Sequence, residues 1–224
     1  MPASQKRPSW QKKRTVQTVR KRQSRGKIYL VAAIIIILTI GVGLYVYVSS
    51  QASNSLPPVV YAKLNTSDGM IEVELYYNAT PKTVANFVSL ANSGFYTNLV
   101  WHRISKVDPF VIQTGDPNTK DGVGNNTNWG SGGSPQTVPL EIVSSLHNYA
   151  GYLGMARGKD LNSGSSQFYI NMADNTDLDT GYTVFGKVIT GMSAATAIWN
   201  TPTYSSEQPT TLVFLTSVTI SDNP

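Results

Sequence analysis

Val100–Asp116 reads VWHRISKVDPFVIQTGD, which places one arginine and one glutamine among apolar side chains. Alternation along residues 110–113 predicts a short strand with Val111 and Gln113 on the same face. Arg103 precedes this strand in another apolar segment. Polar groups beside buried positions must find hydrogen-bond partners or form a site. Arg103 and Gln113 are therefore either satisfied surface side chains or the polar part of a binding site.

Further segments in the second half of the chain complete a set of ordered motifs. The motifs are WHR at 101–103, FVIQTGD at 110–116, MAR at 155–157, SQFYI at 166–170 and VFGKV at 184–188. In this order they resemble the cyclophilin family of peptidyl-prolyl cis-trans isomerases. The resemblance spans about Tyr61 to Ile220 and leaves out the first sixty residues.

The resemblance implies the site residues of an isomerase. Arg103 corresponds to the catalytic arginine, Gln113 to the glutamine that positions the substrate backbone, and Phe110 completes the catalytic group. The implied substrate-binding residues are His102, Val111, Ala156, Arg157, Gln167, Tyr169, Leu178 and Tyr182. A glycine-rich loop, matched here by residues 130–133, would line a second pocket beside the proline site.

Several positions depart from the commonest eukaryotic pattern of this family. Val111 stands in place of methionine, Tyr169 in place of phenylalanine and Tyr182 in place of histidine. Asp177 falls where a tryptophan or phenylalanine usually covers the pocket. A carboxylate there predicts weaker binding of cyclosporin-type ligands, and it is the feature that favours a binding module without turnover as the alternative function.

Composition excludes several other catalytic classes. The chain has no cysteine, which removes disulfides, thiolate nucleophiles and cysteine metal sites. His102 and His147 are the only histidines, and neither an H-E-x-x-H nor a G-x-S-x-G pattern occurs. Residues 122–124 (GVG) lack the remainder of a phosphate-binding loop. We therefore expect no metal and no cofactor, and we expect His102 to be a hydrogen-bonded neighbour of Arg103.

Charge is distributed unevenly along the chain. Residues 1–27 hold ten of the eighteen basic residues and no acidic one, so the remainder carries eight basic and all thirteen acidic residues. We expect this tail to be disordered. A nucleic-acid arm is one reading of the tail. Beside an apolar segment, membrane topology and anionic lipid explain the same charges, so no nucleic-acid partner is expected.

Residues 28–48 (IYLVAAIIIILTIGVGLYVYV) contain 21 uncharged residues. As a helix they would extend about 31 Å, which matches the core of a bilayer. The basic residues on the N-terminal side predict a single-pass anchor in the cell membrane, with the N-terminus cytoplasmic and the rest extracytoplasmic. A signal peptide cleaved after Ala52 is the alternative, although the apolar run exceeds the usual length. Sequons for glycosylation in an exported domain begin at Asn65, Asn78 and Asn125.

Residues 49–58 form a polar linker, and 59–224 form the predicted isomerase domain. Alternating apolar residues predict a hairpin over 60–75, and Thr80-Pro81 predicts a helix start with Thr80 as its N-cap. Short strands are expected at 152–156, 167–171, 184–188 and 212–220, with a second helix at 193–199. The expected fold is mainly β: a closed eight-stranded antiparallel barrel capped by two helices, preceded by one transmembrane helix. A monomer acting on proline-containing polypeptides is expected.

Overall fold

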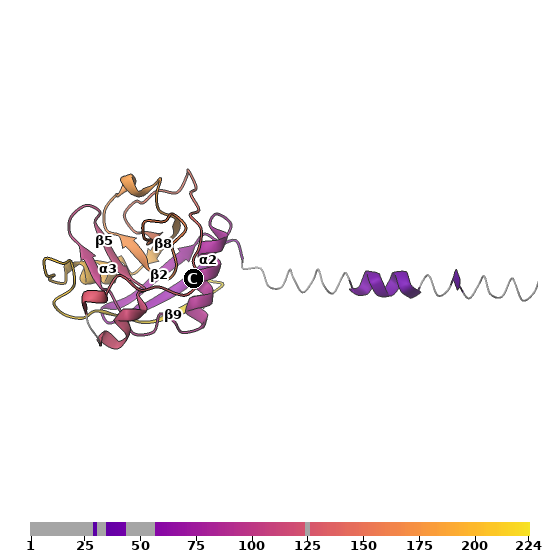
Figure 1. The fold of residues 1–224 in the computed structure, drawn as a ribbon, viewed down its shortest axis with the longest axis horizontal. Coiled ribbons are helices and arrows are strands. Elements are labelled where there is room, and N and C mark those ends of the chain that lie inside the picture. The colour runs from indigo at the N-terminus through magenta and orange to yellow at the C-terminus, as the bar shows by residue number, and fades with distance from the viewer. Residues whose placement is uncertain (1–28, 31–34, 44–56, 124–125) are drawn as a thin grey trace, which may run out of the picture. The chain divides into compact units, whose positions relative to one another are not determined.

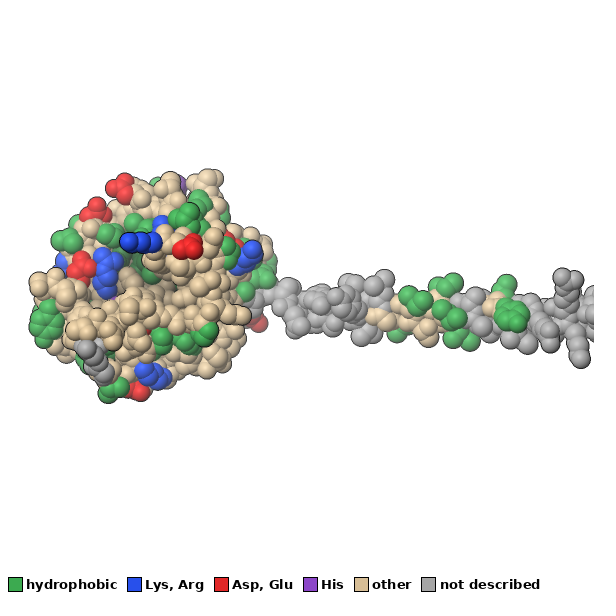
Figure 2. Space-filling view, in the orientation of Figure 1, with side chains coloured by type: hydrophobic (Ala, Val, Ile, Leu, Met, Phe, Trp, Pro, Cys, Tyr) green, Lys and Arg blue, Asp and Glu red, His purple; other side chains and the backbone are tan. Residues whose placement is uncertain are grey.

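The computed structural model describes residues 29–30, 35–43, 57–123 and 126–224. The chain divides into two units, Met1–Ser55 and Leu56–Pro224. In the first unit, residues 29–30 and 35–43 are helical (Figure 1), and their large apolar side chains are exposed (Figure 2). Among the described residues no helix is long and apolar enough to cross a membrane. The rest of the predicted anchor over 28–48, the basic tail and most of the linker lie outside the described residues.

The second unit is a curled antiparallel sheet with two α-helices (Figure 1). Its strands follow the order β3-β9-β1-β2-β8-β6-β7-β5-β4. The strands are β1 Val60–Thr66, β2 Gly69–Leu75, β3 Leu99–Val100, β4 Arg103–Ser105, β5 Val111–Thr114, β6 Tyr152–Met155, β7 Phe168–Asn171, β8 Val184–Thr190 and β9 Phe214–Ser221. The helices are α2 Pro81–Asn92 and α3 Met192–Asn200, with the 3₁₀ turns η1 Pro117–Gly122, η2 Asn126–Asn128 and η3 Thr176–Leu178.

The predicted closed barrel of eight strands is wrong: the sheet has nine strands and curls into a half-barrel. Its edge strands, β3 and β4, are neighbours in the chain, separated only by the buried residues Trp101 and His102. Each edge strand pairs on one side, β3 with β9 and β4 with β5. These two strands have two and three residues, and they stand at opposite ends of the strand order.

The hairpin of β1 and β2 confirms the alternation expected for a half-buried strand pair. Its inward side chains are fully buried, namely Val60, Ala62, Leu64, Ile71, Val73 and Leu75. Gly69 closes the turn with a φ of +124°, a conformation that side chains with a Cβ rarely adopt. The outward face is less exposed to solvent than expected, because Glu72 is buried. Its Oε1 lies 3.4 Å from Lys63 Nζ.

A cluster of aromatic side chains fills the space between α2 and the sheet. Phe87 of α2 lies with its ring centroid 5.4 Å from that of Phe168 and 5.1 Å from that of Tyr96. Trp101 packs edge-on against Phe168 at 6.1 Å. Because Phe168 lies on β7, this core directly supports the strand that also carries Tyr169.

Thr80 occupies the N-cap position of α2, but a distant residue supplies the capping hydrogen bonds. The Thr80 hydroxyl donates back to the carbonyl of Tyr76 at 3.3 Å and makes no capping bond. The backbone N–H groups of Lys82 and Thr83 donate instead to the carboxylate of Glu141 at 3.1 and 2.8 Å. A carboxylate suits this position because it meets both free N–H donors and the positive end of the helix dipole. Thr80 is therefore the N-cap residue, as predicted, and the predicted helix start is confirmed, but the capping hydrogen bonds come from Glu141.

Candidate active site

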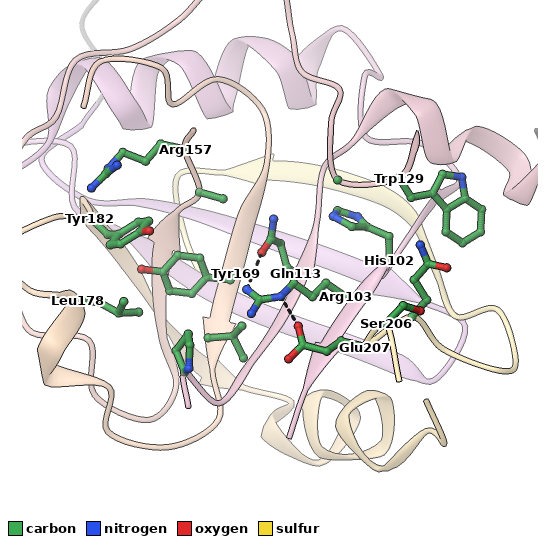
Figure 3. Close-up of a pocket in the computed structure, with 15 residues that line it drawn as sticks. His102, Arg103, Gln113, Trp129, Arg157, Tyr169, Leu178, Tyr182, Ser206 and Glu207 are labelled. Carbon is green, nitrogen blue, oxygen red and sulfur yellow. Dashed lines mark hydrogen bonds and ion pairs between the residues drawn. The ribbon is translucent and has the colours of Figure 1, made fainter. Parts of the chain in front are cut away.

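Four neighbouring strands align residues of the site in one row. Arg103 of β4 pairs with Gln113 of β5, which pairs with Tyr169 of β7, which pairs with Gly154 of β6. Paired residues of neighbouring strands point to the same face of a sheet. A Cβ on Gly154 would lie 2.1 Å from the Tyr169 ring, so only glycine leaves room for the ring to lie across β6. Arg103, Gln113 and Tyr169 of this row line a cavity of about 320 Å³ (Figure 3).

Arg103 is held from two sides in this cavity. Its Nε donates to Glu207 Oε2 at 2.6 Å, and its Nη1 donates to Gln113 Oε1 at 3.5 Å. Glu207 Oε1 accepts a further hydrogen bond from the hydroxyl of Ser105 at 2.6 Å. Within the described part of the chain, Nη2 of Arg103 has no hydrogen-bond partner. The guanidinium therefore keeps its position and still presents free donors.

A chain of amides sets the orientation of Gln113. Its Nε2 donates to Gln167 Oε1 at 2.8 Å, and Gln167 Nε2 donates to the carbonyls of Gly130 and Gly132 at 3.0 and 2.7 Å. The backbone N–H groups of the same glycines donate to the buried carboxylate of Asp116 at 2.5 and 3.2 Å. The amide of Gln113 is therefore fixed with its oxygen toward Arg103.

Apolar and aromatic side chains form one wall of the cavity. Val111, Tyr169 and Leu178 line it, and the rings of Tyr169 and Tyr182 meet edge-on with centroids 6.1 Å apart. Burial raises the pKa of the Tyr169 hydroxyl, helped by the negative charge of nearby acidic groups, so this residue stays neutral. Arg157 lies over the Tyr182 ring, with its Cζ 4.5 Å from the centroid.

His147, which has no role in the sequence-based prediction, supports this wall through a hydrogen-bond network. Tyr169 donates its hydroxyl proton to Asn148 Oδ1 at 2.9 Å, and Asn148 Nδ2 donates to Asp179 Oδ1 at 3.0 Å. His147 Nδ1 lies 2.7 Å from Asp179 Oδ2. Burial alone would raise the pKa of Asp179, but the hydrogen bonds from Asn148 and His147 outweigh it and lower that pKa.

His102 lies in the cavity lining without the hydrogen bond that we expected. It is 3% exposed, and neither ring nitrogen has a partner among the described residues. Burial lowers the pKa of His102 to about 4, against the opposing effect of the Asp116 carboxylate. The expectation of a hydrogen-bonded neighbour of Arg103 is wrong, because the side chain turns toward Gly130 and the Trp129 side of the cavity (Figure 3).

Nine of the eleven predicted site residues line this cavity, and two lie outside its lining. The nine are His102, Arg103, Val111, Gln113, Ala156, Arg157, Tyr169, Leu178 and Tyr182. Phe110 immediately precedes β5 and alternates away from the face that carries Val111 and Gln113. Gln167 lines a neighbouring cavity of about 420 Å³ together with residues 130–133, which are the glycine-rich loop expected beside the proline site.

Sequence reasoning missed a second group of cavity residues: Pro109, Trp129, Ser206, Glu207 and Gln208. They lie in irregular segments without periodicity, so no local pattern marks them. Gly130, from the glycine-rich loop expected beside the proline site, lines both cavities. Asp177 lies exposed on η3, and the cavity lining includes its neighbour Leu178 instead. Trp199 is not among the residues that line the cavity, and its Nε1 donates to the carbonyl of Ser105 at 3.2 Å.

Within the described residues, no group of three or more His, Asp or Glu side chains could hold a metal ion. The chemistry of the cavity rests on one arginine, one fixed amide and an apolar wall. Such a set can bind a small apolar ring and donate hydrogen bonds to an atom beside it.

Comparison with known proteins identifies the family of this chain. Residues 61–220 match the family model described as cyclophilin type peptidyl-prolyl cis-trans isomerase/CLD. The peptidyl-prolyl cis-trans isomerase-like 3 of Rhizopus delemar is 40% identical over 169 residues, which cover 72% of this chain and 94% of the relative. A peptidyl-prolyl cis-trans isomerase of Acinetobacter baylyi is 38% identical over 146 residues, covering 63% of this chain and 72% of the relative.

The fold has the same relatives among solved structures. A crystal structure of a Cryptosporidium parvum cyclophilin type peptidyl-prolyl cis-trans isomerase, in the presence of dipeptide ala-pro, superposes with a TM-score of 0.64. It is 30% identical to this chain, and the match covers 73% of this chain and 99% of that one. The chain therefore belongs to the cyclophilin-type peptidyl-prolyl cis-trans isomerase family and accelerates the rotation of X–Pro peptide bonds.

Proposed function

We propose that the cavity of about 320 Å³ binds the proline of an X–Pro segment and that Arg103 is its catalytic residue. The row of Arg103, Gln113 and Tyr169 across three strands supports this proposal most strongly. It sets free guanidinium donors beside an apolar wall that a proline ring can fill. The solved relative prepared with an Ala-Pro dipeptide is consistent with a ligand of this kind.

Rotation about an X–Pro bond requires the loss of amide resonance, which costs about 18–20 kcal/mol. The twisted amide leaves a localised lone pair on the prolyl nitrogen. A donor aimed at that nitrogen stabilises the twisted state more than either planar state, which is the requirement for catalysis. Arginine suits this role because it remains charged and presents donors in a fixed plane.

One hydrogen bond does not supply the whole effect. A hydrogen bond to a charged group contributes about 1.5–3 kcal/mol, and each 1.36 kcal/mol changes the rate about tenfold. The hydrogen bond from Arg103 therefore accounts for about a tenfold to hundredfold increase in the rate of rotation. The remaining acceleration comes from Val111, Tyr169, Leu178 and Gln113, which hold the ring and the flanking backbone while the bond rotates.

The proposed setting is the extracytoplasmic face of a membrane, where the enzyme assists protein folding. Its support is the sequence: ten basic residues precede 21 uncharged residues at 28–48. Protease added to intact cells should degrade the isomerase domain while a cytoplasmic control protein survives. Full protection of the domain would refute this topology.

The activity is tested on the full chain in detergent with a protease-coupled assay on a prolyl tetrapeptide. We expect turnover by the unmodified protein and its loss in Arg103→Ala. A protein that binds the peptide without accelerating isomerisation would instead be a proline-binding module.

A further inference from the structure

The segment 202–209 connects α3 to β9 and forms one rim of the cavity. It folds back on itself through a bridge between Thr203 and Pro209 and through a hydrogen bond from Tyr204 N to Gln208 O at 2.9 Å. Gln208 also donates from Nε2 to the carbonyl of Asn126 at 2.8 Å, which ties this hairpin to η2. We refer to residues 202–209 as the rim hairpin.

Glu207 joins the rim hairpin to β4 through three separate contacts. Its carbonyl accepts from the backbone N–H of Ile104 at 2.8 Å. Its two carboxylate oxygens accept from Arg103 Nε and from the Ser105 hydroxyl, each at 2.6 Å. Glu207 thus contacts three consecutive residues of the strand that carries the arginine. Its φ is +63°, an uncommon value for a residue with a Cβ, and these contacts hold it there.

The nitrogen at which Glu207 contacts the guanidinium decides which hydrogen-bond donors of Arg103 remain available to a substrate. Glu207 occupies Nε, whereas Gln113 approaches Nη1 from the other side (Figure 3). A carboxylate bound to both terminal nitrogens would block the edge that faces a ligand. Bound at Nε, it fixes the plane of the group and leaves Nη2 free.

We propose that Glu207 is a positioning residue that acts through Arg103, holding the guanidinium plane in the orientation that reaches the prolyl nitrogen. This inference rests on the proposed catalytic role of Arg103. An arginine has several rotatable bonds, so without this partner the donors would sample other directions. Loss of orientation lowers the rate of the chemical step more than it changes ground-state binding of the proline ring.

The experiment compares Glu207→Ala and Glu207→Gln with the unmodified full chain. We expect Glu207→Ala to lower kcat about tenfold and to change KM less than about twofold. Glu207→Gln keeps an acceptor for Nε but loses the charge, so it should lose only about threefold. Glu74→Ala is the matched control: this glutamate accepts from the Tyr76 hydroxyl at 3.0 Å, away from the cavity, and its removal should leave kcat and KM unchanged.

A double-mutant cycle separates positioning of Arg103 from a general effect on the rim. In an Arg103→Ala background, adding Glu207→Ala should change kcat/KM by less than about twofold, because nothing remains to be positioned. A further tenfold loss in that background would overturn the inference. So would an unchanged kcat in Glu207→Ala alone. If Arg103→Ala itself has full activity, the proposed function fails, and this outcome is distinct from the other two.

A spectroscopic measurement keeps the inference testable if the alanine variant is unstable. The Nε–H resonance of Arg103, assigned by its absence in Arg103→Lys, should exchange slowly with water in the unmodified protein. It should broaden or exchange faster in Ser105→Ala and Glu207→Gln. The carboxylate accepts a stronger hydrogen bond than the neutral amide of Glu207→Gln, so unchanged exchange in this variant would contradict the role of the Glu207 charge in holding Nε.

Discussion

The contribution of Arg103 depends on its geometry, because Glu207 and Gln113 fix the direction of its donors. We expect Arg103→Ala to lower kcat/KM for a prolyl peptide by at least about tenfold, since one charged hydrogen bond supplies one to two decades. Arg103→Lys should recover little, because a single ammonium cannot reproduce the planar set of donors. A protease-coupled assay checks this, with the melting temperature as the control for folding. Activity of the alanine variant equal to that of the unmodified protein would contradict it.

His102 predicts how stability depends on pH. Its pKa is lowered to about 4 by burial, whereas the unfolded chain titrates near the ordinary value of about 6.5. Between these values the unfolded state binds a proton that the folded state does not, so the free energy of unfolding falls as pH drops through this window. The difference corresponds to roughly 3 kcal/mol once pH is below the folded pKa.

Urea unfolding at several pH values tests the effect of His102. His102→Leu should flatten the slope between about pH 6.5 and 4. The part of the free energy of unfolding that comes from Glu207 is lost at lower pH. Burial alone would raise the pKa of Glu207, but the hydrogen bonds from Ser105 and Arg103 outweigh it and lower that pKa. A lowered carboxyl pKa adds stability that is lost only as pH falls through the folded value. An unchanged slope in His102→Leu would exclude the histidine as the cause.

Asp177 is exposed on η3, beside Leu178 at the cavity. We expect Asp177→Trp to strengthen binding of a cyclosporin-type ligand by about one to two decades, since an aromatic ring can contribute about 1–3 kcal/mol of contact. Turnover should change less, because Arg103 and Gln113 lie elsewhere in the cavity. Titrating the ligand against both proteins checks the prediction. Nanomolar inhibition of the unmodified protein would indicate that another side chain, such as Trp129, covers the ligand.

Among the elements, α2 depends on a residue far along the chain. At the N-terminus of α2, Glu141 accepts three hydrogen bonds, from the backbone N–H of Lys82 and from the backbone N–H and hydroxyl of Thr83. We expect Glu141→Ala to lower the free energy of unfolding by about 1–3 kcal/mol, because it leaves N–H donors without a partner. Denaturant unfolding measures this loss. The kcat/KM of the remaining folded protein should be unchanged, and a selective loss of activity would contradict a purely structural role.

The sequence predicts the individual strands better than it predicts whether the sheet closes into a barrel. The alternation of 60–75 predicts the β1–β2 hairpin correctly because each side chain reports its own face. Closure of the sheet depends instead on whether β3 and β4 pair with each other. β3 and β4 are separated by Trp101, which packs in the core against Phe168, and His102, which lines the cavity, and this arrangement appears only in three dimensions.

For the whole molecule, the contact map separates Leu56–Pro224 from the preceding residues. We expect residues 59–224 produced alone to be a soluble monomer with a mainly β circular dichroism spectrum, since the whole core lies in this unit. Light scattering and circular dichroism measure mass and secondary structure. A mainly helical or insoluble product would show that the first unit is required for folding.

The sequence by itself determined the family, the strand alternation, the charge asymmetry and most of the cavity. Nine of eleven predicted site residues line it, because motif order and side-chain alternation are local properties. Only the tertiary structure revealed Glu207, 104 positions from Arg103, and Glu141, 58 positions from Thr83. It also showed that neither ring nitrogen of His102 has a hydrogen-bond partner among the residues that the structure describes. Hydrogen bonds between distant segments depend on how the sheet curls, and no local periodicity encodes that curvature.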